Sequence, residues 1–303
     1  MLRTVRNGDV WFVSQPDHAA VSGYLAAHWG NKRFSPLGCF SPVVDAARSL
    51  RAECVFGIAQ HDNGWWEWEA DPELCPSDHL PLDLFDDRMS RQGGFRRWLA
   101  GIERNQDRHP YASLLISWHA YWLYEPSLRP DSDRAFLHPL FWKDNTPTIA
   151  REEVPATERF LEQLASVQLE LAGRVQSDSR HTSWVEPALL HPHVRLLQIL
   201  DGISLAICSA LVPSCDGPTC GHGEDRYPLF DVPSSSWEDR VRIDVHPLGE
   251  RRIRFEPYPF DRDPLPVTVP ARVVSNRQNA DGPFHVRWQA IPQTLLRYEF
   301  SSV

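Results

Sequence analysis

The sequence lacks an uninterrupted apolar run long enough to cross a membrane. Its longest apolar stretch, residues 194–212, carries Arg195 and Asp201, which fit a buried amphipathic helix better than a membrane span. The first nine residues have no apolar signal core. Six cysteines in 303 residues are too few for a disulfide scaffold. We therefore expect a reduced, cytoplasmic protein without a membrane partner.

A concentrated basic segment is also missing. The formal net charge is −9, with 31 Lys and Arg against 40 Asp and Glu, and a nucleic-acid backbone attracts basic surfaces. Extended nucleic acid is therefore a poor partner. A small anionic substrate remains compatible with this charge, because a bound metal ion supplies positive charge locally.

Apolar spacing divides the chain into a helical body and a β-rich tail. Helical periodicity and terminal signals predict helices over residues 15–29, 42–60, 95–105, 111–124, 157–175 and 194–211. Alternating residues predict strands over residues 10–13, 241–245, 252–255, 267–269 and 296–300. We therefore predict a mainly α fold, with a helical metal-binding domain over residues 1–212. A β-rich extension over residues 213–303 would pack on it, or would pair two chains in a homo-oligomer.

The sharpest local signal is the run His61-Asp62-Asn63-Gly64. Neighbouring side chains on a straight helix diverge by about 100°. Both can reach one ion only where the backbone turns, and Asn63-Gly64 supplies a turn at the end of the predicted helix. The pair is therefore a candidate for one nitrogen ligand and one carboxylate ligand.

Three further candidates lie on other predicted helices. His18 is near the start of the first, His119 is in the middle of another, and Asp201 interrupts the most apolar one. A buried carboxylate is costly unless it is paired or bound to a metal. For Asp201 the alternatives are an ion pair with an arginine such as Arg195 or a turn-facing polar position. For the two histidines the alternatives are a core role for His119 and a surface position for His18. The predicted metal ligands are His18, His61, Asp62, His119 and Asp201, with Asp62 and His119 as catalytic groups.

The order His…His-Asp…His…Asp resembles the HD superfamily of metal-dependent phosphohydrolases. More closely, the chain resembles the uncharacterised family DUF3891 over most of residues 10–210. The segments that carry this resemblance are SQPDHA at 14–19, AAHWGN at 26–31, HDNGW at 61–65, YASLLISWH at 111–119 and LLQILD at 196–201. The resemblance to HD proteins implies an HD-like helical bundle.

The same resemblance implies a ligand set. One ion would be bound by the residues that match the HD pattern, His18, His61, Asp62 and Asp201. A second ion would share the aspartate and add His119 and one further histidine, for which the candidates are His181, His191 and His193. Mixed nitrogen and oxygen ligands favour Fe, Mn, Zn, Ni or Co over Ca or Mg.

Three functions are compatible with these ligands. The HD resemblance implies a hydrolase that acts on a phosphate ester or nucleotide through a metal-bound hydroxide. Some HD-fold proteins resemble di-iron oxygenases, which is the second reading. The third is a non-enzymatic protein that binds a small ligand in a helical pocket.

Three groups of residues lie outside the predicted ligand set. Trp65, Trp66 and Trp68 could form a stacking wall or simply the core. Arg96, Arg97 and Lys143 could contact an anion or lie on the solvated surface. The segment 215–222 contains two cysteines and a histidine, which indicates either a zinc site or a loop.

Overall fold

Strands from both ends of the chain form one seven-stranded sheet. The computed structural model describes residues 1–40, 47–129, 131–275 and 284–303. The strands are β1 (Leu2–Arg6), β2 (Asp9–Val13), β3 (Tyr227–Pro233), β4 (Arg240–Gly249), β5 (Arg252–Glu256), β6 (Leu265–Ser275) and β7 (Gln293–Ser301). Their order is β1-β2-β6-β7-β5-β4-β3. Strands β5 and β7 are parallel, and the other neighbours are antiparallel.

A tight hairpin adds the N-terminus to this sheet. Arg6 pairs with Asp9, and the two turn residues Asn7 and Gly8 have φ angles of 53° and 84°. Both values lie in the left-handed region that the two central residues of a type I′ hairpin turn adopt, which favours Asn-Gly. Strand β2 then pairs with β6, so residues close to each end of the chain meet.

The predicted mainly α fold is therefore wrong. The chain is about 45% helix and 20% strand, and the sheet is mixed and strongly curved. The expectation failed because β1 and β3 were not predicted, and because local periodicity does not show that N-terminal residues pair with the tail. The division into residues 1–212 and 213–303 stays a prediction, although one sheet takes strands from both segments.

Each of the six predicted helices corresponds to a helix of the structure. These are α1 (Gln15–Ala27), α2 (Ala47–Ala59), α4 (Arg91–Asn105), α5 (Pro110–Leu128), α6 (Val154–Gln176) and α7 (Pro187–Cys208). The start of the predicted helix 42–60 lies outside the described residues. Unpredicted elements are α3 (Trp66–Ala70), α8 (Phe284–Ala290) and the 3-10 helices η1 (Asn63–Trp65), η2 (Arg134–Phe136), η3 (Pro139–Phe141) and η4 (Thr182–Val185).

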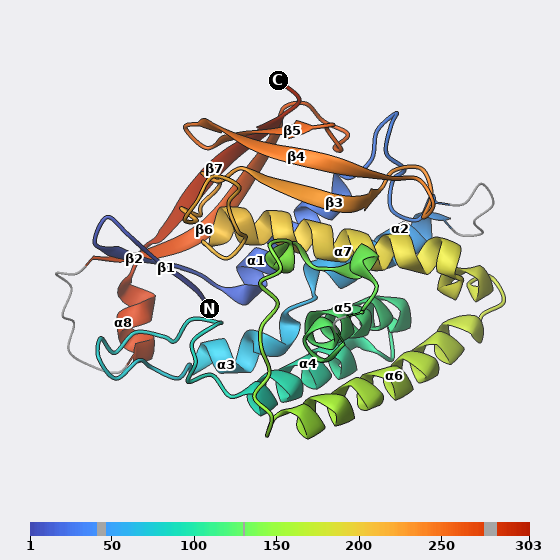
Figure 1. Ribbon diagram of the computed structural model, residues 1–303, viewed down its shortest axis with the longest axis horizontal. Helices are drawn as coiled ribbons and strands as arrows, with labels where there is room; N and C mark the ends of the chain where they lie inside the picture. Colours follow the sequence, from blue (N-terminus) through green and yellow to red (C-terminus); the bar gives the residue numbers. More distant parts are fainter. Residues whose placement is uncertain (41–46, 130, 276–283) are drawn as a thin grey trace.

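Helix α7 occupies the middle of the molecule. The sheet lies over α1 and α7, and α4, α5 and α6 lie on the opposite side of α7 (Figure 1). From Val194 to Cys208 every residue of α7 is buried, which explains why apolar residues occur all round this helix. Asp201 thus lies in the interior, where α1, α2 and α5 also contact α7. None of the helices in the described ranges has both the length and the apolar character that crossing a bilayer requires.

Candidate metal centre

All five predicted ligands converge inside the helical layer. His18 comes from α1, His61 and Asp62 follow the end of α2, His119 comes from α5, and Asp201 comes from α7. Each is at most 6% exposed. Two groups bring ligand atoms within 4.8 Å of one another: the first is His18, His61 and Asp62, and the second is His61, His119 and Asp201. These buried His/Asp clusters could hold a metal ion.

Asp201 lies between the histidines and uses both carboxylate oxygens. Its Oδ1 is 2.8 Å from Nε2 of His18 and 3.5 Å from Nε2 of His61. Its Oδ2 faces the opposite side and lies 3.3 Å from Nε2 of His119. The predicted alternative of an ion pair with Arg195 does not occur, because that guanidinium donates to the carbonyls of Leu137 and Phe230 and to a glutamine side chain.

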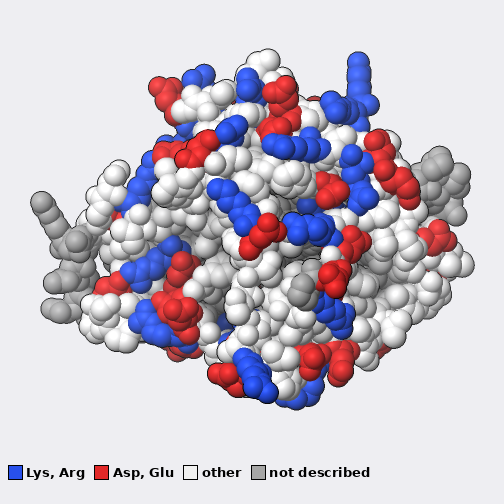
Figure 2. Space-filling model, in the orientation of Figure 1, with Lys and Arg blue, Asp and Glu red and all other residues white. Residues whose placement is uncertain are grey.

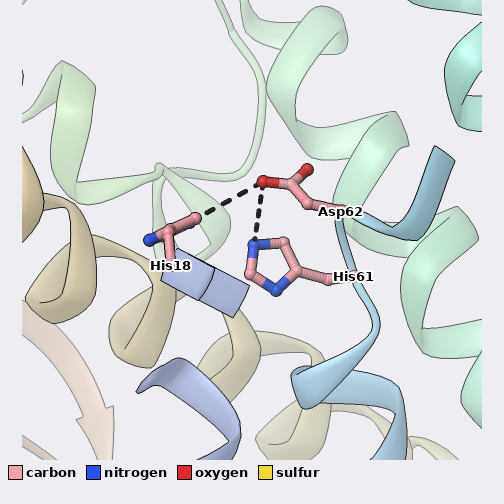
Figure 3. A group of neighbouring side chains, drawn as sticks. All are labelled: His18, His61 and Asp62. Carbon is pink, nitrogen blue, oxygen red and sulfur yellow. Dashed lines mark ion pairs between the residues drawn. The ribbon is translucent and has the colours of Figure 1, made fainter. Parts of the chain in front are cut away.

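Asp62 completes the first group. Its Oδ2 lies 3.7 Å from Nε2 of His18 and 3.5 Å from Nε2 of His61. Figure 3 shows this oxygen directed toward both rings, whereas the other oxygen points away from them. Two carboxylates and two imidazoles therefore surround one position, with mixed oxygen and nitrogen donors.

A close contact between backbones holds the His61-Asp62 turn in place. Helix α2 ends at Ala59, and η1 begins at Asn63, so the pair lies where the chain changes direction. A Cβ atom added at Gly64 would lie only 1.9 Å from the carbonyl oxygen of Arg97 on α4. Glycine is therefore required there for steric reasons, because the turn packs directly against the backbone of α4.

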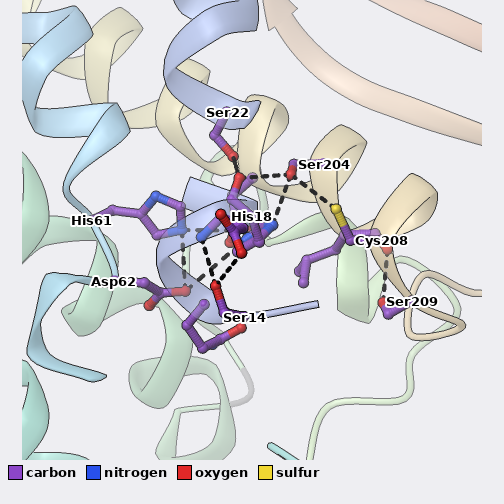
Figure 4. A network of polar contacts seen from close by, with 12 residues as sticks. Ser14, His18, Ser22, His61, Asp62, Ser204, Cys208 and Ser209 are labelled. Carbon is purple, nitrogen blue, oxygen red and sulfur yellow. Dashed lines mark hydrogen bonds and ion pairs between the residues drawn. The ribbon is translucent and has the colours of Figure 1, made fainter. Parts of the chain in front are cut away.

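Hydrogen bonds set the tautomers of His18 and His61. Nδ1 of His61 lies 2.8 Å from the carbonyl oxygen of Ile58, which can only accept, so Nδ1 carries a proton. Nδ1 of His18 lies 2.7 Å from Oγ of Ser204. That hydroxyl donates its hydrogen to the carbonyl of His18, so the ring nitrogen is again the donor (Figure 4).

These tautomers leave the Nε2 lone pairs of both rings directed at carboxylate oxygens. Within the described residues, Nε2 of His61 and Oδ1 of Asp201 are buried and have no hydrogen-bond partner. Acceptors that face one another in the interior repel unless a cation or a proton lies between them. Histidines that ligate metals in proteins commonly donate the other ring N–H to a carbonyl or hydroxyl in this way. The residues present therefore fit a bound metal ion.

The pKa values of the cluster also indicate that it favours a positive charge. Burial lowers the pKa of His61, but the carboxylates of Asp62 and Asp201 outweigh it and raise this pKa to about 9. Burial also raises the pKa of Asp62. Burial also tends to raise the pKa of Asp201. However, the charge of His61 and hydrogen bonds with the other histidines hold the pKa of Asp201 well below its usual range. In contrast, burial lowers the pKa of His119 to about 4.

A fourth histidine, His138, was not predicted from the sequence. It is fully buried, and its Nε2 lies 2.9 Å from Oδ2 of Asp201. It lies in the irregular segment before η3, where no helical period marks it as inward-facing. The only local signal is the pair His138-Pro139, since proline often occupies the first position of a helix.

The three histidines that were candidate ligands of a second metal ion contact other parts of the structure. His193 receives the N–H of Gly38 at Nε2, and its Nδ1 lies 2.7 Å from the hydroxyl of Tyr111. His191 packs against Phe136 and Trp237, and the ring of His181 stacks on Trp184. None of the three belongs to a group with metal-ligand spacing in the described ranges.

A cavity of about 440 Å³ opens beside the cluster. His18, Asp62, His119 and Asp201 line it, together with Arg97 from α4. The Arg97 guanidinium lies 4.0 Å from the centre of the Trp65 ring. Aromatic stacking of this kind holds a guanidinium in a fixed orientation.

The tryptophans, the basic residues and the cysteines singled out in the sequence lie in different places. Trp65 lies beside the cavity, whereas Trp66 is 43% exposed. Lys143 lies over the ring of Trp142, outside the cavity lining. Cys215 and Cys220 are free, and neither belongs to the metal-spaced groups found in the described part of the chain.

Comparison with known proteins identifies a family for this chain but no individual relative. No curated protein and no solved structure matches it. One family model, described as "Protein of unknown function (DUF3891)", matches residues 1–276, which include every ligand candidate and six of the seven strands. The chain therefore belongs to the DUF3891 family.

Proposed function

We propose that this protein is a metal-dependent hydrolase that cleaves a phosphate ester or nucleotide. The observation that carries the proposal is the convergence of ligand lone pairs on the wall of a cavity. Oδ2 of Asp62 lies 3.7 Å from Nε2 of His18 and 3.5 Å from Nε2 of His61. Oδ1 of Asp201 lies 2.8 Å from Nε2 of His18. A bound ion of the Fe, Mn, Zn, Ni or Co class would lower the pKa of a coordinated water to near neutrality.

The position of Arg97 supports the proposal that the substrate is anionic. In the described part of the chain its guanidinium has no carboxylate within ion-pair distance, although Arg91 in the same cavity pairs with Glu153 at 3.0 Å. Burial lowers the pKa of Arg97, but arginine stays protonated at neutral pH. An unpaired, stacked guanidinium beside a metal centre suits a phosphate group, which offers two oxygens to its N–H groups.

The cavity also provides a neutral imidazole. His119 lines the wall, its Nε2 lies 3.3 Å from Oδ2 of Asp201, and its Nδ1 is buried without a hydrogen-bond partner in the described residues. Because its pKa is near 4, the ring is uncharged at neutral pH and can take up or return a proton. We propose this role for His119, and we propose Asp62 as the ligand that orients the attacking water.

The surface charge is compatible with a small ligand. On the face shown in Figure 2, basic and acidic residues are interspersed, and no extended basic area is visible. An extended polyanion binds to such areas, whereas a single phosphate group needs only the local charge of the centre and Arg97.

The experiment that tests the proposal combines metal loading with a substrate panel. The purified protein is loaded separately with Mn, Fe, Zn, Ni and Co and offered phosphomonoesters, phosphodiesters and nucleotides. We expect release of phosphate or alcohol with at least one ion, and its loss in Asp62→Asn. Turnover of no ester with any of the five ions would overturn the proposal, and two irons per chain with O₂ consumption would favour the oxygenase instead.

A matched pair of variants tests the anion site. Arg97→Met should raise KM at least tenfold with a smaller change in kcat, because binding of the phosphate group is lost. Arg104→Met is the control, since Arg104 also lies over a tryptophan ring, Trp66, but pairs with Glu67 outside the cavity. Equal KM values for both variants would argue against an anion contact at Arg97.

A further inference from the structure

We propose that His138 is a positioning residue that holds Asp201 by a hydrogen bond and is not itself a metal ligand, so that the centre retains one ion. This inference rests on the metal centre proposed above. It differs from the sequence expectation that one further histidine would complete a second metal site. The geometry on both sides of the His138 ring carries the argument.

A backbone donor fixes the orientation and tautomer of this ring. The N–H of Leu140 donates to Nδ1 of His138 at 3.1 Å, as His138 caps the 3-10 helix η3. A nitrogen that accepts a hydrogen bond carries no proton, so the single proton of the neutral ring lies on Nε2. Nε2 is 2.9 Å from Oδ2 of Asp201, and its N–H donates to that oxygen. It therefore has no lone pair to offer to an ion.

His18 and His61 have the opposite tautomer. Their Nδ1 protons point to Ser204 and to the carbonyl of Ile58, which leaves the lone pair on Nε2, next to the carboxylates. A neutral imidazole binds a metal through the nitrogen that lacks the proton. The local hydrogen bonds thus prepare two of these rings as ligands and one as a donor.

The distance between His138 and Asp201 is set by the close packing of their neighbours in sequence. Pro139 follows His138, and Gly202 follows Asp201. A Cβ atom added at Gly202 would lie 2.6 Å from Cγ of Pro139, closer than van der Waals contact allows. The absence of a side chain at Gly202 lets η3 approach the backbone of α7, which brings the imidazole within hydrogen-bond distance of the carboxylate.

One resident ion follows from this assignment. Oδ2 of Asp201 receives the hydrogen bond from His138, and the two metal-spaced groups in the described residues share His61. When His61 serves the ion beside His18 and Asp62, a second ion has only His119 and one carboxylate oxygen as protein ligands. Such a pair does not retain a transition-metal ion through purification, because stable protein sites of this type have three or four protein ligands.

Two substitutions separate the two halves of the His138 ring. In His138→Asn the side-chain oxygen takes the place of Nδ1 and keeps the bond to Leu140, but the amide stops short of Asp201. In His138→Gln the amide nitrogen reaches Asp201, but the N–H of Leu140 loses its acceptor. The number of zinc or manganese ions per chain is measured by elemental analysis, and the dissociation constant by competition with a chelator.

We expect one ion per wild-type chain, an affinity about 10- to 100-fold weaker in His138→Asn, and an affinity in His138→Gln closer to that of the wild type. Unchanged affinity in His138→Asn would overturn the positioning role. Two ions in the wild type with one in both variants would show that His138 is a ligand. A wild type that retains no ion would instead reject the metal centre itself.

A spectroscopic measurement keeps the inference testable even if a variant misfolds. Long-range ¹H–¹⁵N correlation of the wild-type protein, loaded with zinc, reports which ring nitrogen of each histidine carries a proton. We expect the proton on Nε2 of His138 and on Nδ1 of His18 and His61. A proton on Nδ1 of His138 would contradict the donor assignment.

Discussion

Substitution of Gly64 by alanine should disrupt the metal centre through the backbone alone. The added Cβ would lie 1.9 Å from the carbonyl oxygen of Arg97, and ordinary contact begins at about 3.4 Å. The turn and α4 must therefore separate by about 1.5 Å, and neither partner is a flexible side-chain end. Overpacking of this kind costs about 1–3 kcal/mol, and we expect the upper end of that range. Because His61 and Asp62 lie three and two residues before Gly64, their ligand atoms move with the turn.

The assay is thermal unfolding of the metal-free protein, followed by measurement of metal affinity. At an unfolding entropy of about 2.1 cal/mol/K per residue, a loss of about 3 kcal/mol lowers the Tm of this 303-residue chain by about 5 °C. Gly173→Ala is the control, because Gly173 lies in α6, is exposed and has no atom within 4 Å of an added Cβ. That change should stabilise the protein by about 0.5–1 kcal/mol. A Gly64→Ala variant with the wild-type Tm and metal affinity would refute the reasoning.

Three further predictions concern the ligands and their protons. Because the pKa of His61 in the metal-free fold is about 9, above its usual 6.5, its contribution to stability is complete below pH 6.5 and is lost as pH rises through 9. A bound ion displaces this proton, so metal affinity should rise about tenfold per pH unit from pH 7 to 9. Calorimetry should show one proton released per bound ion. A metal affinity that does not change with pH would contradict this prediction. Asp201→Asn should lower the pKa of His61 toward or below 6.5, measurable by NMR titration, since one of the two carboxylates that raise it is lost; a pKa that stays near 9 would show that Asp62 suffices. Ser204→Ala removes the acceptor that orients Nδ1 of His18 and should weaken metal binding about 10- to 100-fold; an unchanged dissociation constant would count against a fixed tautomer.

Much of the helical layer was readable from local sequence. Apolar periodicity placed six helices, because a helix that buries one face repeats its apolar residues every three or four positions. The sheet was less accessible. The hairpin signal Asn7-Gly8 was present, but the pairing of β2 with β6 joins residues more than 250 positions apart. No local pattern encodes such a contact.

The sequence by itself determined which residue types were available for a metal centre. His61-Asp62 before a turn, His18 and His119 on helices, and a carboxylate at Asp201 in an apolar helix were each visible as single positions. A carboxylate in such a helix is informative, because burial of a charge needs a partner. That inference requires only the neighbours of Asp201 along the chain.

Only the tertiary structure decided how these side chains share their lone pairs and protons. Asp201 directs one oxygen at His18 and the other at His138, and the ring of His138 is set by the amide of Leu140. The direction of a hydrogen bond depends on where donor and acceptor lie in space, and η3, α1 and α7 meet only in the folded chain. The difference between a ligand and a donor histidine is therefore a property of packing, which residue order alone does not specify.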